Sequence, residues 1–177
     1  MSKITRSNIT TSQTIGPFSH EAWQWLVDTG LPGNLKTAEH SIQLSGCIYD
    51  GDGNPINDAQ VEAWTPEGAG LETEQLIPGL RRMPSGDGGE FSMRVPAPQA
   101  GRGEPLAYIT VFARGLVKHQ FTAVFLEDDA GLAQSTILNQ VPEARRALLV
   151  ARRSGDGEYR WDIRMQGENE TPFFDYV

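Results

Sequence analysis

The chain has 177 residues, of which 38% are hydrophobic and 21% charged, and it contains 19 Gly and 11 Pro. This composition is typical of one ordered domain with many turns, and it excludes an intrinsically disordered chain. The formal net charge of -8 repels a phosphate backbone, so we expect no nucleic-acid partner.

Residues 1–14 are polar and rich in Ser and Thr, without the apolar segment that a signal peptide or a membrane anchor needs. We therefore expect no association with a membrane. Cys47 is the single cysteine, which rules out an internal disulfide and favours a cytoplasmic location.

Apolar residues between His20 and Asp28 predict a short N-terminal helical segment. From Ile42 onward apolar and polar residues alternate, as is typical of a half-buried strand. Further runs rich in β-branched and aromatic residues predict six more strands, at 59–65, 90–95, 106–113, 121–126, 147–153 and 158–165. We therefore expect an all-β fold, a β-sandwich of mostly antiparallel strands in a single domain spanning 1–177, with long loops such as 66–89.

Asp50, Asp52 and Asn54 match the first ligands of a calcium loop, but Pro55 and Val61 stand where such a loop needs Gly and Glu. A hairpin turn explains this run better. The histidines have no spacing that would place two imidazoles on one metal; they are His20, His40 and His119.

Three arginine pairs, at 81–82, 145–146 and 152–153, are interpreted as solvated surface residues. The carboxylates at 128–129 follow a strand and are interpreted as structural groups of a turn. The apolar end of the chain, 173–177, is predicted to dock either on its own sheet or at a subunit interface. The residues alone thus indicate an acidic β-sandwich without a complete catalytic set.

Four stretches together resemble the intradiol ring-cleavage dioxygenases, and in particular the α chains of that family. They are SQTIGPF at 12–18, GCIYDGDG at 46–53 with VEAW at 61–64, FARG at 112–115, and DIRMQGENETPFFD at 162–175. The likeness spans nearly the whole chain.

The resemblance implies an oxidoreductase in which an α chain pairs with a β subunit that holds Fe(III) through two tyrosinates and two histidines. The implied reaction cleaves protocatechuate with O2 between its two hydroxylated carbons and gives 3-carboxy-cis,cis-muconate. The present chain would then be an α subunit that is active only in the complex, with an N-terminal arm of about 1–40 at the subunit interface.

Where an iron-binding relative has Pro-Ala-His-x-His, this chain has Leu106 and Tyr108 in the two histidine positions. Leucine cannot ligate a metal, and the loop 68–88, where a tyrosine ligand would be sought, contains no tyrosine. We therefore expect neither a metal site nor a catalytic residue on this chain.

The resemblance places four residues at the substrate pocket of the partner: Thr14, Gly16, Pro17 and Arg114. Gly and Pro permit close approach of the backbone, and Arg114 would offer a positively charged fork to an anionic substrate. Phe18 departs from the family, in which an aromatic residue with a hydroxyl is common there, and the connection 65–90 is shorter than the family pattern.

Two other interpretations remain open. A stand-alone β-sandwich binding module would have the same fold but no enzyme partner, and it would be a monomer. An independent metalloenzyme is disfavoured by the missing histidine pair, and it would be recognised by tightly bound iron in the purified chain.

Overall fold

The computed structural model describes residues 14, 16, 41–65, 77–97 and 101–175, and nearly all of its regular structure is β-strand. The strands are β1 (Ser41–Tyr49), β2 (Gln60–Trp64), β3 (Leu80–Pro84), β4 (Glu90–Pro96), β5 (Ala107–Phe112), β6 (Gln120–Leu126), β7 (Val150–Gly155), β8 (Glu158–Arg160) and β9 (Ile163–Arg164). Short helical turns lie between β6 and β7, namely η4 (Leu132–Gln134), η5 (Leu138–Gln140), α3 (Glu143–Arg146) and η6 (Ala147–Leu149). The predicted all-β class is confirmed.

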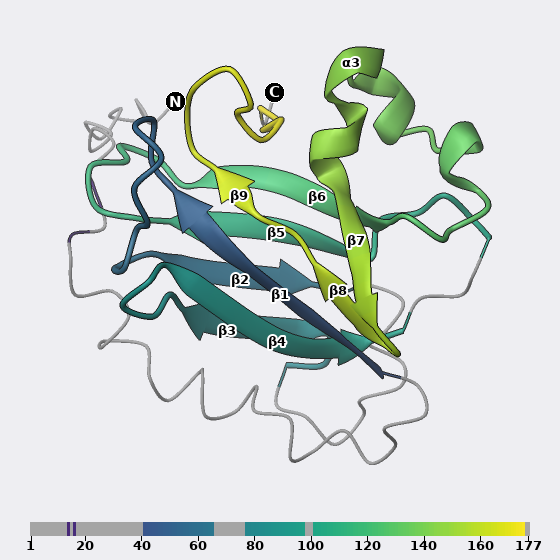
Figure 1. Cartoon of the computed structure of the whole chain (residues 1–177), viewed down its shortest axis with the longest axis horizontal. Helices are drawn as coiled ribbons and strands as arrows, with labels where there is room; N and C mark the ends of the chain where they lie inside the picture. Colours follow the sequence, from purple (N-terminus) through teal and green to yellow (C-terminus); the bar gives the residue numbers. More distant parts are fainter. Residues whose placement is uncertain (1–13, 15, 17–40, 66–76, 98–100, 176–177) are drawn as a thin grey trace, which may run out of the picture.

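The strands form one sheet in the order β3-β2-β5-β6-β7-β8-β1-β4, with β9 beside β1. Figure 1 shows β1, β4 and β8 crossing in front of β2, β3 and β5, so the sheet folds back on itself in two layers. The two ends of the path, β3 and β4, are consecutive in the chain, and Arg81 Nε on β3 donates to the Arg94 carbonyl on β4 at 2.8 Å. The two layers of the predicted sandwich are therefore joined at their edges, and the architecture is barrel-like.

Most neighbouring strands are antiparallel, as predicted. The parallel pairs among the described strands are β1 with β8, β1 with β9, and β6 with β7. The pairing of β6 with β7 connects the two layers through only two residue pairs, Phe125 with Val150 and Leu126 with Ala151.

The core fills the space between the two layers. Alternate residues of β1 point inward, so Ile42, Leu44 and Ile48 are buried while their neighbours are partly exposed. On the opposite layer Ile109 and Val111 of β5 face them from the inner side of the sheet. The alternation of apolar and polar residues that predicted β1 from the sequence thus matches the alternation of buried and partly exposed side chains along the strand.

The predicted long loop 66–89 contains a strand, β3, which the sequence did not reveal. Two arginines and a proline within five residues do not resemble an alternating apolar strand. Arg81 nevertheless points inward and is 2% exposed, and its Nη1 donates to the Leu80 carbonyl at 2.9 Å. The prediction that this arginine pair is solvated was wrong, because the partner Arg82 is also mostly covered and pairs with Glu62.

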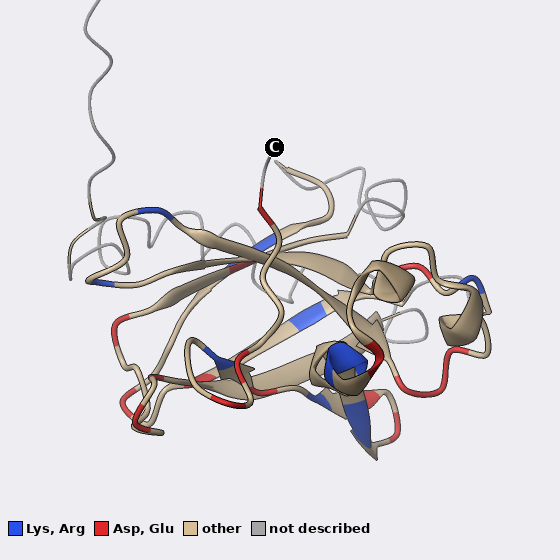
Figure 2. Ribbon diagram, turned by 90° about the horizontal axis from the view of Figure 1, so that it is seen from above, with Lys and Arg blue, Asp and Glu red and all other residues tan. Residues whose placement is uncertain are grey.

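Figure 2 shows where the charged residues lie: acidic residues gather in the turns and loops, whereas several arginines lie on strands. The other two predicted arginine pairs are more exposed. Arg152 pairs with Glu127 at 3.3 Å, Arg153 pairs with Asp156 at 3.1 Å, and Arg145 donates to the Glu170 carbonyl at 2.8 Å.

Two predicted strands have different bounds in the structure. Ala147–Leu149 is a 3-10 turn that precedes β7, and the run 158–165 splits into β8 and β9 on either side of Trp161. The indole Nε1 of Trp161 donates to the Leu148 carbonyl at 2.8 Å, which ties the split to the start of β7.

The predicted turn after β1 is present. The Asp50 carboxylate accepts hydrogen bonds from the backbone N–H groups of Asp52 at 2.9 Å and Asn54 at 2.8 Å, and the bond from Asn54 is the main reason that the pKa of Asp50 lies below its ordinary value. Asp129 likewise accepts the N–H groups of Gly131 and Gly103, which confirms its structural role. These carboxylates hold turns by side-chain to backbone hydrogen bonds.

The C-terminal tail docks on the chain's own sheet as far as it is described. Phe174 N donates to the Phe121 carbonyl at 2.7 Å, and the Thr122 hydroxyl donates to the Pro172 carbonyl at 2.7 Å. The predicted helical segment at 20–28 lies outside the described residues. Among those residues, every helix is too short or too polar to span a lipid bilayer.

Candidate functional site

The outer face of β2 and β5 carries a continuous set of side chains. The antiparallel register of these strands places residues of equal orientation opposite one another: Gln60 with Phe112, Glu62 with Thr110, and Trp64 with Tyr108. Because side chains alternate between the two faces of a strand, these six share the face opposite to Val61, Ala63, Ile109 and Val111, although Gln60 is itself covered and only 1% exposed. The strand β6 extends this face with Phe121, which lies opposite Thr110.

A groove of about 320 Å³ lies on this face. Its walls are mostly aromatic and aliphatic; the lining residues are Glu62, Trp64, Leu80, Tyr108, Thr110 and Phe121. The rings of Tyr108 and Phe121 stack with centroids 5.9 Å apart, and the ring of Phe174 from the tail meets Phe121 edge-on at 6.3 Å. Trp64 is 39% exposed, a large exposed fraction for an apolar side chain of this size.

Tyr108, which the sequence resemblance places at one of the two histidine positions of iron-binding relatives, lies in this groove. Burial raises the pKa of its hydroxyl, and the negative charge of Glu104 raises it further. The other position, Leu106, is 3% exposed and its backbone N–H extends the pairing with β6 through the Val124 carbonyl. A leucine side chain has no donor atom, so the two positions do not supply a pair of metal ligands.

Within the described residues no three His, Cys, Asp or Glu side chains lie close enough together to hold a metal ion. The absence of a metal site from the whole chain stays a prediction.

Arg114 lies at the end of the same outer face. The alternation of β2 and β5, continued two residues past Gln60 and Phe112, places Asp58 opposite Arg114, and Arg114 Nε lies 2.8 Å from Asp58 Oδ2. The arginine side chain is 67% exposed and the aspartate side chain 10%. The sequence motif identified the arginine, but Asp58 was missed because it precedes β2 in an irregular segment. The signal that could have found it is the same even-numbered series that contains Gln60 and Trp64.

Thr14 and Gly16 contact each other, because the Gly16 N–H donates to the Thr14 hydroxyl at 3.3 Å. Gly16 has φ of +82°, a left-handed conformation that glycine adopts without strain. Pro17 lies outside the described residues, as does Phe18. Neither Thr14 nor Gly16 hydrogen-bonds to Arg114 in the described part of the chain, and the placement of these residues at the partner's substrate pocket stays a prediction.

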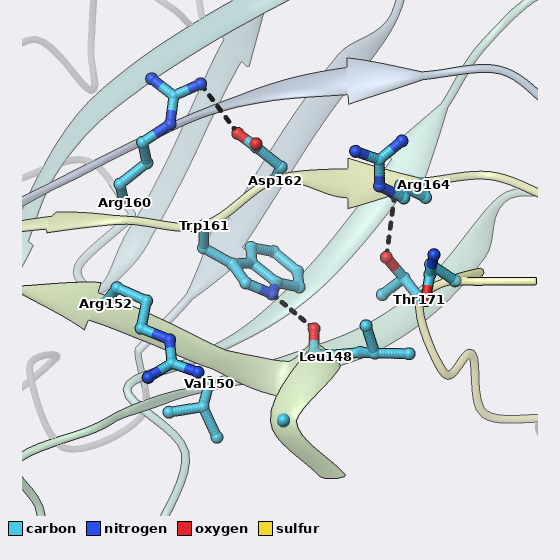
Figure 3. Close-up of a pocket in the computed structure, with 10 residues that line it drawn as sticks. Leu148, Val150, Arg152, Arg160, Trp161, Asp162, Arg164 and Thr171 are labelled. Atoms are coloured by element: carbon cyan, nitrogen blue, oxygen red, sulfur yellow. Dashed lines mark hydrogen bonds and ion pairs between the residues drawn. The ribbon is translucent and has the colours of Figure 1, made fainter. Parts of the chain in front are cut away.

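A second cavity, of about 290 Å³, lies beside Trp161 (Figure 3). Three arginines line it, and two already have acidic partners: Arg160 pairs with Asp162, which also lines the cavity, at 3.1 Å, and Arg152 pairs with Glu127 at 3.3 Å. Figure 3 shows Arg152 and Arg160 extending to opposite sides of Trp161. Their guanidinium groups do not converge on one point, as an anion site requires.

No protein-family model matches the chain. A protocatechuate 3,4-dioxygenase alpha chain from Burkholderia cepacia is 37% identical over 153 residues, which cover 77% of each chain. A protein of the same name from Pseudomonas putida is 33% identical over 199 aligned positions, which cover 94% of this chain and 96% of the relative.

Solved structures share the fold at lower identity. The dioxygenase domain of a dioxygenase and carbohydrate-binding fusion protein from a Streptomyces species has a TM-score of 0.57 at 17% identity, covering 75% of this chain and 86% of that one. A hydroxyquinol 1,2-dioxygenase from Pseudomonas putida has a TM-score of 0.53 at 17% identity, covering 93% and 69%. These likenesses carry the fold alone, whereas the identity with the two curated relatives over most of their length shows that this chain belongs to the family of protocatechuate 3,4-dioxygenase alpha chains, among the intradiol dioxygenases.

Proposed function

We propose that this chain lines the substrate pocket of a protocatechuate 3,4-dioxygenase whose Fe(III) is held by a β subunit. The complex would cleave protocatechuate with O2 to 3-carboxy-cis,cis-muconate. One observation carries the proposal: the chain is 33–37% identical to relatives named as alpha chains, yet Leu106 and Tyr108 stand in the positions of two iron ligands.

The iron belongs to the partner in this proposal, because the chain's own residues do not suit it. Ferric iron is a hard ion that binds phenolate, imidazole and carboxylate groups, and a buried leucine offers none of these. When bound to the partner, the iron supplies the redox chemistry of ring cleavage. The present chain contributes side chains that bind and orient the substrate.

The outer face of β2, β5 and β6 is the surface that we expect to meet the β subunit. Two observations support it. The groove there is lined by Trp64, Tyr108 and Phe121, and exposed aromatic clusters of this kind are enriched at protein interfaces. Arg114, which the resemblance places at the substrate pocket, lies at the end of the same face. Docking of the β subunit on this face would therefore cover the groove and bring the arginine to the partner's pocket.

A cytoplasmic location is part of the proposal. The half-buried Cys47 is a free thiol, and a protein without disulfides fits a reducing compartment.

The first experiment compares the chain purified alone with the chain co-expressed with its candidate β subunit. We expect iron, visible colour and protocatechuate-dependent oxygen uptake only in the co-expressed sample. Iron content and oxygen uptake of both preparations are the measurements.

Iron and activity in the lone chain would contradict the assignment of the metal to the partner. A well-behaved monomer that forms no complex would instead favour the stand-alone binding module, since an obligate subunit requires a large interface with one specific partner.

A further inference from the structure

Asp58 is a buried carboxylate with a single partner. Its side chain is 10% exposed, and neither of its oxygen atoms accepts a hydrogen bond of good geometry from the described residues. The contact that remains is the ion pair with Arg114, whose Nε lies 2.8 Å from Oδ2. A carboxylate withdrawn from water is unfavourable unless a paired charge compensates it, so the position of this residue needs an explanation beyond packing.

The backbone next to Asp58 is held rigidly. The Ala59 N–H donates to the Ser85 hydroxyl at 2.9 Å, and the Ser85 N–H donates back to the Ala59 carbonyl at 2.9 Å. Ser85 is 6% exposed and lies where the chain leaves β3. This reciprocal pair anchors the start of β2 and the backbone from which the Asp58 side chain extends.

Arg114 uses only one edge of its guanidinium for this ion pair. The pair engages Nε, whereas Nη1 and Nη2 form no hydrogen bond with the described residues, and the side chain is 67% exposed. The guanidinium has five N–H donors in a rigid plane, and two of its edges can each bind a carboxylate. Asp58 therefore leaves the donors at the outer end of the plane available to a second anion.

The turn after Arg114 also keeps this arginine at the outer end of β5. The Leu116 N–H donates to the Ala113 carbonyl at 3.3 Å, and Gly115 has φ of +83°. A β-carbon at Gly115 would be strained in this conformation. The chain therefore reverses directly after Arg114, which leaves the arginine at the outer end of the β5 face.

We propose that Asp58 is a positioning residue, which holds the Arg114 guanidinium by Nε so that its Nη groups face the carboxylate of the substrate. The inference rests on the proposed function, because the pocket that Arg114 faces is completed by the β subunit. It adds a specificity determinant: the substrate's carboxylate is recognised by an arginine whose plane is fixed by a buried acid. A lysine could not replace the arginine here, because an ammonium lacks the planar fork that binds two anions at once.

The test uses the complex of this chain with its iron-bearing β subunit. Binding of protocatechuate and of catechol, the same diol without the carboxylate, is followed through the visible absorbance of the iron complex. We expect Asp58→Asn to raise the Kd of protocatechuate about tenfold, the effect of one weakened charge-assisted hydrogen bond. The Kd of catechol should stay unchanged.

Two further variants distinguish the proposal from the function on which it rests. Arg114→Ala should weaken protocatechuate binding at least as much, and the double variant should be no weaker than Arg114→Ala alone, because the two residues act as one unit. Equal binding by Arg114→Ala and wild type would overturn the pocket role of Arg114. Loss of binding in Arg114→Ala but not in Asp58→Asn would overturn the positioning role alone.

Structural effects are controlled by Asp156→Asn, which removes the acid of an exposed ion pair with Arg153 at 3.1 Å, and which should bind both ligands like wild type. If Asp58→Asn yields no complex, Asp58→Glu keeps the charge and displaces it by one methylene. That variant should bind protocatechuate more weakly than wild type while its catechol binding is retained. Equal weakening for both ligands would mean that Asp58 is a structural residue only.

Discussion

At the scale of single residues, the largest errors of sequence-based prediction concern buried charges. Arg81 belongs to a pair that resembles a solvated surface feature, yet it is 2% exposed. Its guanidinium satisfies backbone carbonyls of β3 and β4, and such partners are created only when the strands come together. Hydropathy describes the cost of burying a side chain but not the partners that offset that cost.

Tyr159, a buried residue that can ionise, gives a prediction about how the stability of the fold depends on pH. It is 5% exposed, and its hydroxyl donates to Asp128 Oδ2 at 2.6 Å. Burial, followed by this hydrogen bond, raises the pKa of Tyr159 to about 12 from an ordinary 10.0. The folded state thus holds the phenolic proton more tightly than the unfolded state. Its stabilising contribution is complete below the unfolded pKa and is lost as the pH rises toward the folded pKa.

We expect Tyr159→Phe to lower the free energy of unfolding by about 1 kcal/mol at neutral pH, because one hydrogen bond is removed. Between about pH 9 and about pH 12 the variant should lose less stability than wild type, since it has no such proton to release. Denaturant unfolding of the variant and of wild type, at about pH 9 and at about pH 12, measures this difference in stability. An identical loss in both proteins would show that other groups cause the alkaline destabilisation.

At the scale of elements, prediction succeeded where a strand has one solvent-exposed and one buried face. The alternation of β1 and β5 was visible in the sequence and matches their burial patterns, and the Asp50 turn was recognised by its Asp, Gly and Asn residues. β3 was missed because its inward residue is Arg81. The candidate site was only half visible: the motif contained Arg114, but Asp58 becomes its neighbour only through the register of β2 and β5.

The contact of β1 with the segment after β8 is so close that it needs a glycine. A β-carbon at Gly46 would lie far inside contact distance of the Trp161 carbonyl, which is backbone and cannot rotate away. We expect Gly46→Ala to lower the free energy of unfolding by about 2 to 3 kcal/mol, measured by denaturant titration. Gly51→Ala is the matched control, because its β-carbon would meet side-chain atoms of Gln166 at 3.0 Å or more and no backbone atom among its three nearest contacts. A similar small effect of both substitutions would show that the two segments can separate without cost.

At the scale of the whole molecule, the two layers differ in what their outer faces offer. The layer of β2, β5 and β6 presents the aromatic groove, whereas β7 and β8 carry arginines engaged in ion pairs. Only the first face combines apolar area with a residue placed by resemblance at a substrate pocket. The proposed function needs one such face, because the β subunit would have to be held firmly enough for Arg114 to reach its pocket.

Trp64 tests whether that face binds the β subunit. Because its side chain is 39% exposed, Trp64→Ser should leave the stability of the α chain within about 1 kcal/mol of wild type. Its affinity for the β subunit should fall about tenfold or more, since buried tryptophans dominate interface energies. Sedimentation of the two chains mixed at several concentrations measures the Kd of the complex.

Tyr49→Ser is the control for that measurement, because Tyr49 is a partly buried aromatic residue on β1, in the opposite layer, where its ring packs under the Arg164 guanidinium. If both variants bind the β subunit like wild type, neither layer supplies the interface, and the arm that precedes β1 would have to hold the complex together. If only Tyr49→Ser weakens the complex, the docking face has been assigned to the wrong layer. Weakening by Trp64→Ser alone would place the groove, Arg114 and the partner's pocket on one continuous surface.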